Sequence, residues 1–104
     1  MVYITQEDPR KNLLPAAKYG ELKVVLPQGN ICFSTGEVVH RCRKELSRFN
    51  DKDYLLLIGD PIAIAIATVV ASETNQGKVK FLKWDRQEQI YYPVEINLYQ
   101  KGER

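Results

Sequence analysis

Three carboxylates and one lysine are the residues of this chain whose types could carry out chemistry: Asp60, Asp85, Glu88 and Lys83. Clustered in space, such groups bind a divalent cation, which can activate water for hydrolysis. Asp60 stands between a predicted strand and a predicted helix, where open α/β sheets usually bind ligands. However, the spacing matches no nuclease pattern, and the phosphate-binding patterns GxGxxG and GxxxxGKS/T are absent. We therefore expect Asp60 to cap the helix and Asp85 to serve a turn; a small metal-dependent hydrolase is an alternative.

No catalytic residue, cofactor or metal ligand is predicted. The chain has two cysteines, Cys32 and Cys42, and a single histidine, His40. These are too few for a disulfide framework and lack the spacing of a structural zinc site. Both thiols are expected to be reduced inside a cell, and His40 to lie on the surface.

Four basic residues occupy the outer face of a helix predicted over residues 35–49: Arg41, Arg43, Lys44 and Arg48. Such a face could contact the phosphates of a nucleic acid. The net charge of the chain is only +2, the same helix contains acidic residues, and no aromatic side chain lies among the basic ones to stack on bases. Nucleic-acid binding is therefore a second alternative.

Four further residues, Trp84, Arg86, Tyr91 and Tyr99, are candidates for binding a partner protein. Tryptophan and arginine dominate the binding energy of protein interfaces. Tyr91 and Tyr99 belong to the last predicted strand, where alternation places them on the side away from the core. Pro93 predicts that this strand lies at a sheet edge, because proline cannot donate to a ladder. Exposed aromatic residues on an edge strand favour contact with another protein or with a second copy in a homodimer.

The size and composition of the chain indicate one globular domain. It has 104 residues, of which 44% are hydrophobic and 27% are charged, as in ordinary soluble proteins. The N-terminus does not resemble a signal peptide, and the most apolar window, residues 61–72, is shorter than the ~20 residues that span a membrane. We expect a cytoplasmic protein that has no membrane partner.

The order of predicted elements indicates an α/β fold. Residues 1–21 are expected to form an N-terminal arm with a short strand at 2–5, residues 22–100 a single α/β domain, and residues 101–104 a polar tail. In the domain the patterns predict strands over 22–27, 54–58, 79–84 and 90–99 and helices over 35–49 and 62–74. The expected fold is a four-stranded mixed sheet in the order β-α-β-α-β-β, with two helices.

Three local patterns support this assignment. The box Ser34-Thr-Gly-Glu37 predicts the start of the first helix, after a short extended piece at 31–33. The strand at 54–58 is continuously apolar, which predicts a central strand covered on both faces. The helix at 62–74 is apolar at nearly every angle, which predicts a helix buried on all sides.

The chain resembles a group of small uncharacterised proteins of tailed bacteriophages and environmental viral sequences. The segments that carry the resemblance are Asp53-Tyr-Leu-Leu-Leu-Ile-Gly-Asp-Pro61, Asn75-Gln-Gly77 and Leu82-Lys-Trp-Asp-Arg86, within a similarity that runs from about Tyr19 to Leu98. The resemblance implies a phage gene expressed in the cytoplasm of a bacterial host, and it implies no activity. The function predicted from sequence is a non-enzymatic phage accessory protein that binds, and so modulates, a host or phage protein.

Overall fold

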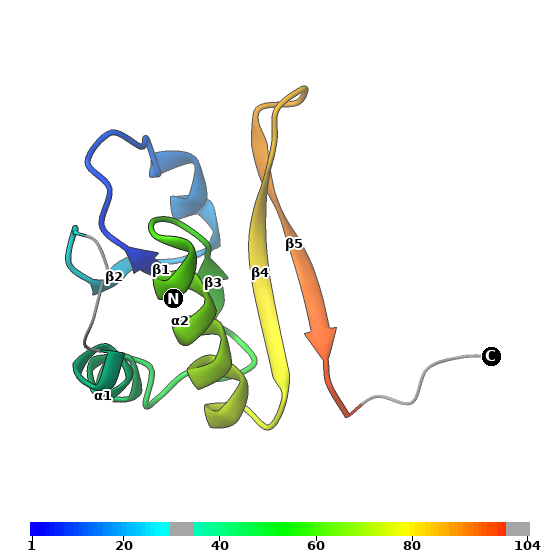
Figure 1. Cartoon of the computed structure of the whole chain (residues 1–104). Helices are drawn as coiled ribbons and strands as arrows, with labels where there is room; N and C mark the ends of the chain where they lie inside the picture. The colour runs from blue at the N-terminus through cyan, green and yellow to red at the C-terminus, as the bar shows by residue number, and fades with distance from the viewer. Residues whose placement is uncertain (30–34, 100–104) are drawn as a thin grey trace.

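The computed structural model describes residues 1–29 and 35–99 of the chain, and Figure 1 shows the arrangement of its elements. Within these residues there are five strands, two α-helices and one 3₁₀ helix. In chain order they are β1 (Val2–Gln6), η1 (Leu14–Tyr19), β2 (Leu22–Leu26), α1 (Thr35–Glu45), β3 (Tyr54–Leu56), α2 (Pro61–Thr74), β4 (Lys78–Asp85) and β5 (Ile90–Asn97). The α/β class is confirmed. The box at Ser34, the extended piece at 31–33 and the tail at 101–104 lie outside the described residues.

The strands of the described chain form one mixed sheet in the order β2-β1-β3-β4-β5, in which β1 to β4 are parallel and β5 is antiparallel to β4. The prediction of four strands is wrong, because β1 is a full member of the sheet. It lies between β2 and β3, and Val2 pairs with both Leu22 and Tyr54. The first residues of the chain are therefore an inner strand of the sheet instead of an arm, and all five residues of β1 are buried.

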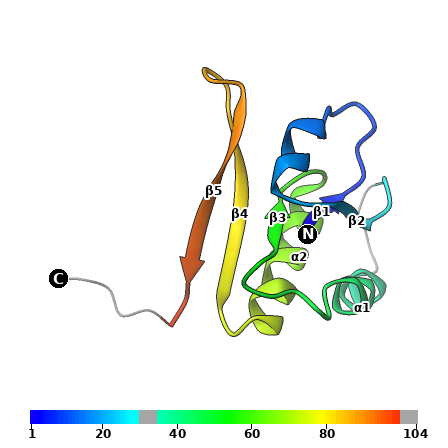
Figure 2. The same cartoon turned by 180° about the vertical axis from the view of Figure 1, so that it is seen from behind.

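Two layers cover the two faces of the sheet. The step from β1 to β2 runs across the sheet in the direction opposite to the steps from β2 to β3 and from β3 to β4. Because crossovers between parallel strands are right-handed, a reversed step places its connection on the opposite face. Accordingly η1 covers one face, and α1 and α2 lie together on the other (Figures 1 and 2).

Alternate residues of β1, β3 and β4 belong to two separate cores. Tyr3, Leu55 and Val79 face the α-helices, where the core includes Cys42, Leu46, Phe49, Ala63, Ala67, Val70 and Ala71. Val2, Ile4, Leu56, Leu82 and Tyr91 face η1 and pack with Ala16. The prediction that β3 is an inner strand covered on both faces is confirmed.

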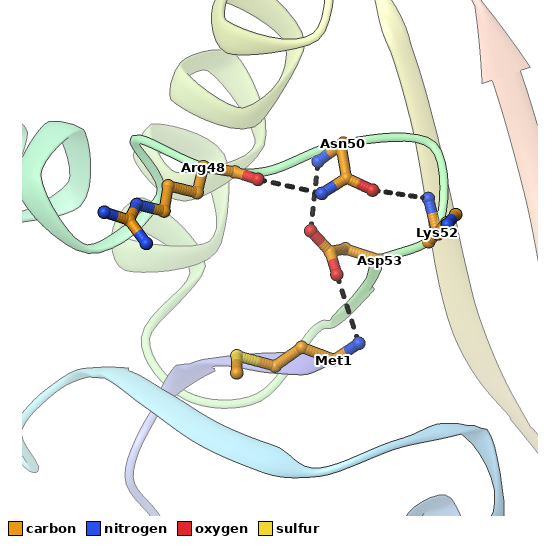
Figure 3. A network of polar contacts seen from close by, with 5 residues as sticks. All are labelled: Met1, Arg48, Asn50, Lys52 and Asp53. Carbon is orange, nitrogen blue, oxygen red and sulfur yellow. Dashed lines mark hydrogen bonds and ion pairs between the residues drawn. The ribbon is translucent and has the colours of Figure 1, made fainter.

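Helix α1 ends at Glu45, four residues before its predicted end, and a turn follows. Leu46 and Phe49, which follow the helix, are nevertheless buried, with 0% and 3% of their surface exposed. Asp53 fixes the loop that comes next: its carboxylate accepts from the Asn50 backbone N–H at 3.0 Å and lies 3.1 Å from the Met1 nitrogen (Figure 3). This contact joins the start of β1 to the loop that leads into β3.

Helix α2 begins as the sequence predicts. The Asp60 carboxylate accepts from the Ile62 N–H at 2.8 Å, and Pro61 occupies the first turn. However, the prediction that the helix is buried on all sides is wrong, because its inner face packs on the sheet while Ile62 and Val69 are 50% and 57% exposed. In the described chain no further layer lies over the helix.

The β4–β5 hairpin extends beyond the rest of the sheet in both views (Figures 1 and 2). Strand β5 is an edge strand, as Pro93 predicts. The Leu98 N–H donates to the Gly77 carbonyl, so alternate N–H groups along β5 point to β4, and the Pro93 nitrogen points away from the ladder. Proline at this position therefore costs no hydrogen bond in the sheet.

Candidate functional site

The carboxyl ends of β1 and β3 meet at the point where the direction of the crossovers reverses, which is the usual ligand site of an open α/β sheet. In this protein the side chain of Gln6 fills that position and is only 3% exposed. Its Oε1 accepts from the Asp60 N–H at 2.7 Å, and its Nε2 donates to the carbonyls of Pro27 and Gly29. Gln6 therefore ties the loop after β2 to the turn after β3.

Thr5 and Gly59 complete this closed junction. The Thr5 hydroxyl donates to the Ile58 carbonyl and accepts from the Ile58 N–H, so it replaces a pair of ladder bonds beyond the end of β3. Gly59 has a φ of +108°, and a Cβ there would collide with the side chain of Gln6. The junction is thus packed by the protein's own groups, and sequence reasoning missed it because it depends on polar residues of β1.

Two of the three carboxylates that could have served hydrolysis, Asp60 and Asp85, have local structural partners. Asp60 caps α2, and the Asp85 Oδ1 accepts from the backbone N–H groups of Gln87 and Glu88 at 3.0 and 3.3 Å. Among residues 1–29 and 35–99, no group of three or more histidine, cysteine or acidic side chains could hold a metal ion.

The basic residues of α1 do not form one continuous surface. The Arg41 Nε donates to the Val25 carbonyl at 3.2 Å, which directs this side chain toward β2. The Arg43 guanidinium lies 3.7 Å from the Glu73 carboxylate, on the side of α2. Lys44 is exposed, and Arg48 is exposed in the turn beyond the end of the helix.

Trp84 is 39% exposed near the end of the hairpin and packs edge-on against Tyr91, with ring centroids 4.8 Å apart. Tyr91 is 6% exposed, so the prediction that it faces away from the core is wrong. Its carbonyl accepts from the Tyr19 hydroxyl at 2.8 Å, and burial raises the pKa of its own phenol. The face of β5 that carries Tyr91 is covered by η1, which explains the error.

Tyr91 therefore packs beneath the ring of Trp84 and is itself almost fully buried. The Tyr19 ring continues the cluster to Tyr54 at 5.2 Å, and the Lys80 ammonium lies 4.3 Å from the centre of the Tyr54 ring. We call Trp84 together with Arg86, which is exposed in the adjacent turn, the hairpin surface.

Tyr99 lies at the other end of the hairpin, so the structure does not bring it together with Trp84. It is 77% exposed beyond the end of β5, and Leu98 beside it is 63% exposed. The ring packs on Gly77, where a Cβ would lie 2.7 Å from the ring carbon Cε2. With Val69 and Glu73 of α2, Tyr99 lines a hollow on the helix side of the sheet.

A second surface, which sequence reasoning missed, lies on the outer face of α2. A hollow between α1 and α2 is lined by Val39, Ala65, Ile66 and Val69 and flanked by charged side chains. The sequence signal for this surface is that residues 61–72 contain no charged side chain. Only one face of the helix packs on the sheet, so the other face is apolar and exposed. The same pattern predicts complete burial, which the structure does not show.

A mixed sheet that is covered on both faces and closed at its crossover junction defines a small α/β protein. The chain belongs to the Phage Pam3 gp32-like protein family, which it matches over residues 1–98. The resemblance to phage proteins is thereby confirmed. Comparison with curated proteins and with solved structures gives no match. No helix in the described part of the chain has the length and apolar character needed to cross a bilayer.

Proposed function

We propose that this protein is a non-enzymatic phage accessory protein that acts in the host cytoplasm by binding a host or phage protein through its hairpin surface. The observation that carries the proposal is the partly exposed Trp84, whose ring packs on the buried Tyr91, on a hairpin that extends beyond the rest of the sheet.

The support beneath Trp84 makes it suited to binding. Its ring rests on Tyr91, which is buried and held by the hydrogen bond from Tyr19. A side chain that is already fixed loses little conformational entropy when a partner covers it. Tryptophan and arginine are also the residues that most often dominate interface energy, and Arg86 lies two residues away in the turn.

The test is affinity capture from lysate of the bacterial host, with mass spectrometry of the bound proteins. We expect the unchanged protein to recover a specific partner, and Trp84→Ala or Arg86→Ala to lose it. Leu14→Ala is the matched control, because Leu14 is a 74% exposed apolar residue outside the hairpin surface, and this variant should retain the partner. Retention of the partner by both hairpin variants would refute the proposal.

Nucleic-acid binding through α1 is the alternative, supported by the exposure of Lys44 and Arg48. It predicts binding to DNA or RNA that weakens with added salt and with the paired change Arg41→Ala and Arg43→Ala. The absence of binding at low salt would reject it.

A further inference from the structure

The outer face of α2 is apolar where a surface helix is normally charged. Residues 61–72 contain no charged side chain, whereas the outside of the neighbouring α1 carries Arg41, Arg43 and Lys44. Ile62 and Val69 are 50% and 57% exposed on this face, and Ala65 lies between them. Each Å² of such surface that is removed from water contributes about 25 cal/mol, so covering this face would be favourable.

The shape of this face suits a second helical layer. A hollow runs between α1 and α2, lined by Val39, Ala65, Ile66 and Val69. Because Ala65 has a small side chain, another helix could approach α2 closely at this point. We call these four residues, together with Ile62, the α2 surface.

The charges beside the α2 surface indicate what covers it. Arg43 and Glu73 flank the hollow, one of each sign, 3.7 Å apart and with 64% and 59% of their side chains exposed. A face with one cation and one anion is complementary to a copy of itself. In a two-fold symmetric dimer, Arg43 of each copy can lie opposite Glu73 of the other copy. We infer that a second copy of this chain binds the α2 surface, forming a symmetric dimer.

This dimer leaves the hairpin surface free. Trp84 lies on the side of the sheet that η1 covers, and α2 lies on the other side. The α2 dimer does not use the edge of β5 either. It therefore differs from a dimer in which the β5 strands of two copies pair at the sheet edge. The inference is therefore independent of the proposed partner, and a dimer would present two hairpin surfaces.

The first test measures molar mass by analytical ultracentrifugation over a range of protein concentrations. We expect the unchanged protein to be a dimer, and Val69→Glu to raise its dissociation constant by about 30-fold or more, because the carboxylate would be buried in the interface. Leu14→Glu is the matched control, since it adds the same charge at an exposed apolar site elsewhere, and it should remain dimeric. Circular dichroism checks that each variant is folded.

The second test uses the two flanking charges. Arg43→Glu gives a face with two anions and Glu73→Arg a face with two cations, so each variant alone should be monomeric. Mixed in equal amounts, the two variants should form a heterodimer, because the anions of one chain face the cations of the other. Within each chain, positions 43 and 73 still carry like charges and repel each other. Only an interface between chains gives this result.

Three outcomes would overturn the inference. They are a monomeric unchanged protein at high concentration, a Val69→Glu variant that dimerises like the unchanged protein, and a mixture of the charge variants that stays monomeric. Capture of another protein by a monomer, lost in Val69→Glu, would show instead that a different partner covers the face.

Discussion

Replacing Gln6 with leucine tests whether the crossover junction is held closed by a buried amide. Leucine has a similar size and would fit the same space, but it can neither donate nor accept a hydrogen bond. The change leaves the Asp60 N–H and the carbonyls of Pro27 and Gly29 without the partner that Gln6 provides.

The magnitude follows from these three groups. A buried polar group that loses its partner costs about 1–3 kcal/mol, and a carbonyl costs less than an N–H when water reaches it. Full loss at the Asp60 N–H and partial loss at the two carbonyls sum to about 3 kcal/mol. For a domain of this size, each kcal/mol lowers Tm by about 4 °C or more, so we expect Gln6→Leu to lower Tm by roughly 12 °C.

Urea unfolding followed by far-UV circular dichroism measures the free energy of unfolding directly. Gln87→Leu is the matched control, because Gln87 is exposed in the hairpin turn, and its replacement should change stability by less than about 0.5 kcal/mol. A Gln6→Leu variant as stable as this control would refute the reasoning, since the amide would then contribute nothing to closing the junction.

Three further outcomes are expected. Gly59→Ala should lower the free energy of unfolding by more than about 1 kcal/mol, because φ is +108° and a Cβ would strike Gln6; a smaller loss in urea unfolding would contradict the packing described here. Gln89→Gly should raise it by about 0.5 kcal/mol, because Gln89 has a φ of +55°, whereas Gln87→Gly, in the same turn but without a positive φ, should not. Burial raises the pKa of the Cys42 thiol from 9.0 to about 11, so the unfolded chain loses this proton first. The free energy of unfolding should therefore fall as pH rises from 9 toward 11. In Cys42→Ala this fall should be less steep than in the unchanged protein, by up to about 1.4 kcal/mol per pH unit. Equal slopes in the two proteins would show that the thiol has the same pKa in the folded and unfolded states.

The parts of the fold that were predictable from sequence depend on local signals. Asp60 and Pro61 specify the start of α2 through backbone preferences and a hydrogen bond to a neighbouring residue. Pro93 specifies an edge strand because it lacks a donor. The continuously apolar β3 indicates coverage on both faces. None of these inferences requires knowledge of distant contacts.

The parts that failed depend on distant contacts. The short strand at 2–5 is predicted, but not its place inside the sheet, because Thr5 and Gln6 are polar and are buried only through partners after β2 and β3. Alternation assigns Tyr91 to one face of β5 but does not reveal that η1 covers that face. The apolar sequence of α2 predicts burial, but it does not reveal that the outer face is left exposed among the residues that the structure describes.

The position of β1 also constrains how the chain folds. Its neighbours β2 and β3 do not pair with each other, so β1 is the link that joins the two halves of the sheet. During synthesis β1 precedes the other four described strands, and its partner at Tyr54 emerges much later. Pairings between residues so far apart in the chain form slowly. Until β3 is made, the hydrogen-bonding edge of β1 is open to other strands, and this is the period in which the nascent protein is most exposed to mispairing.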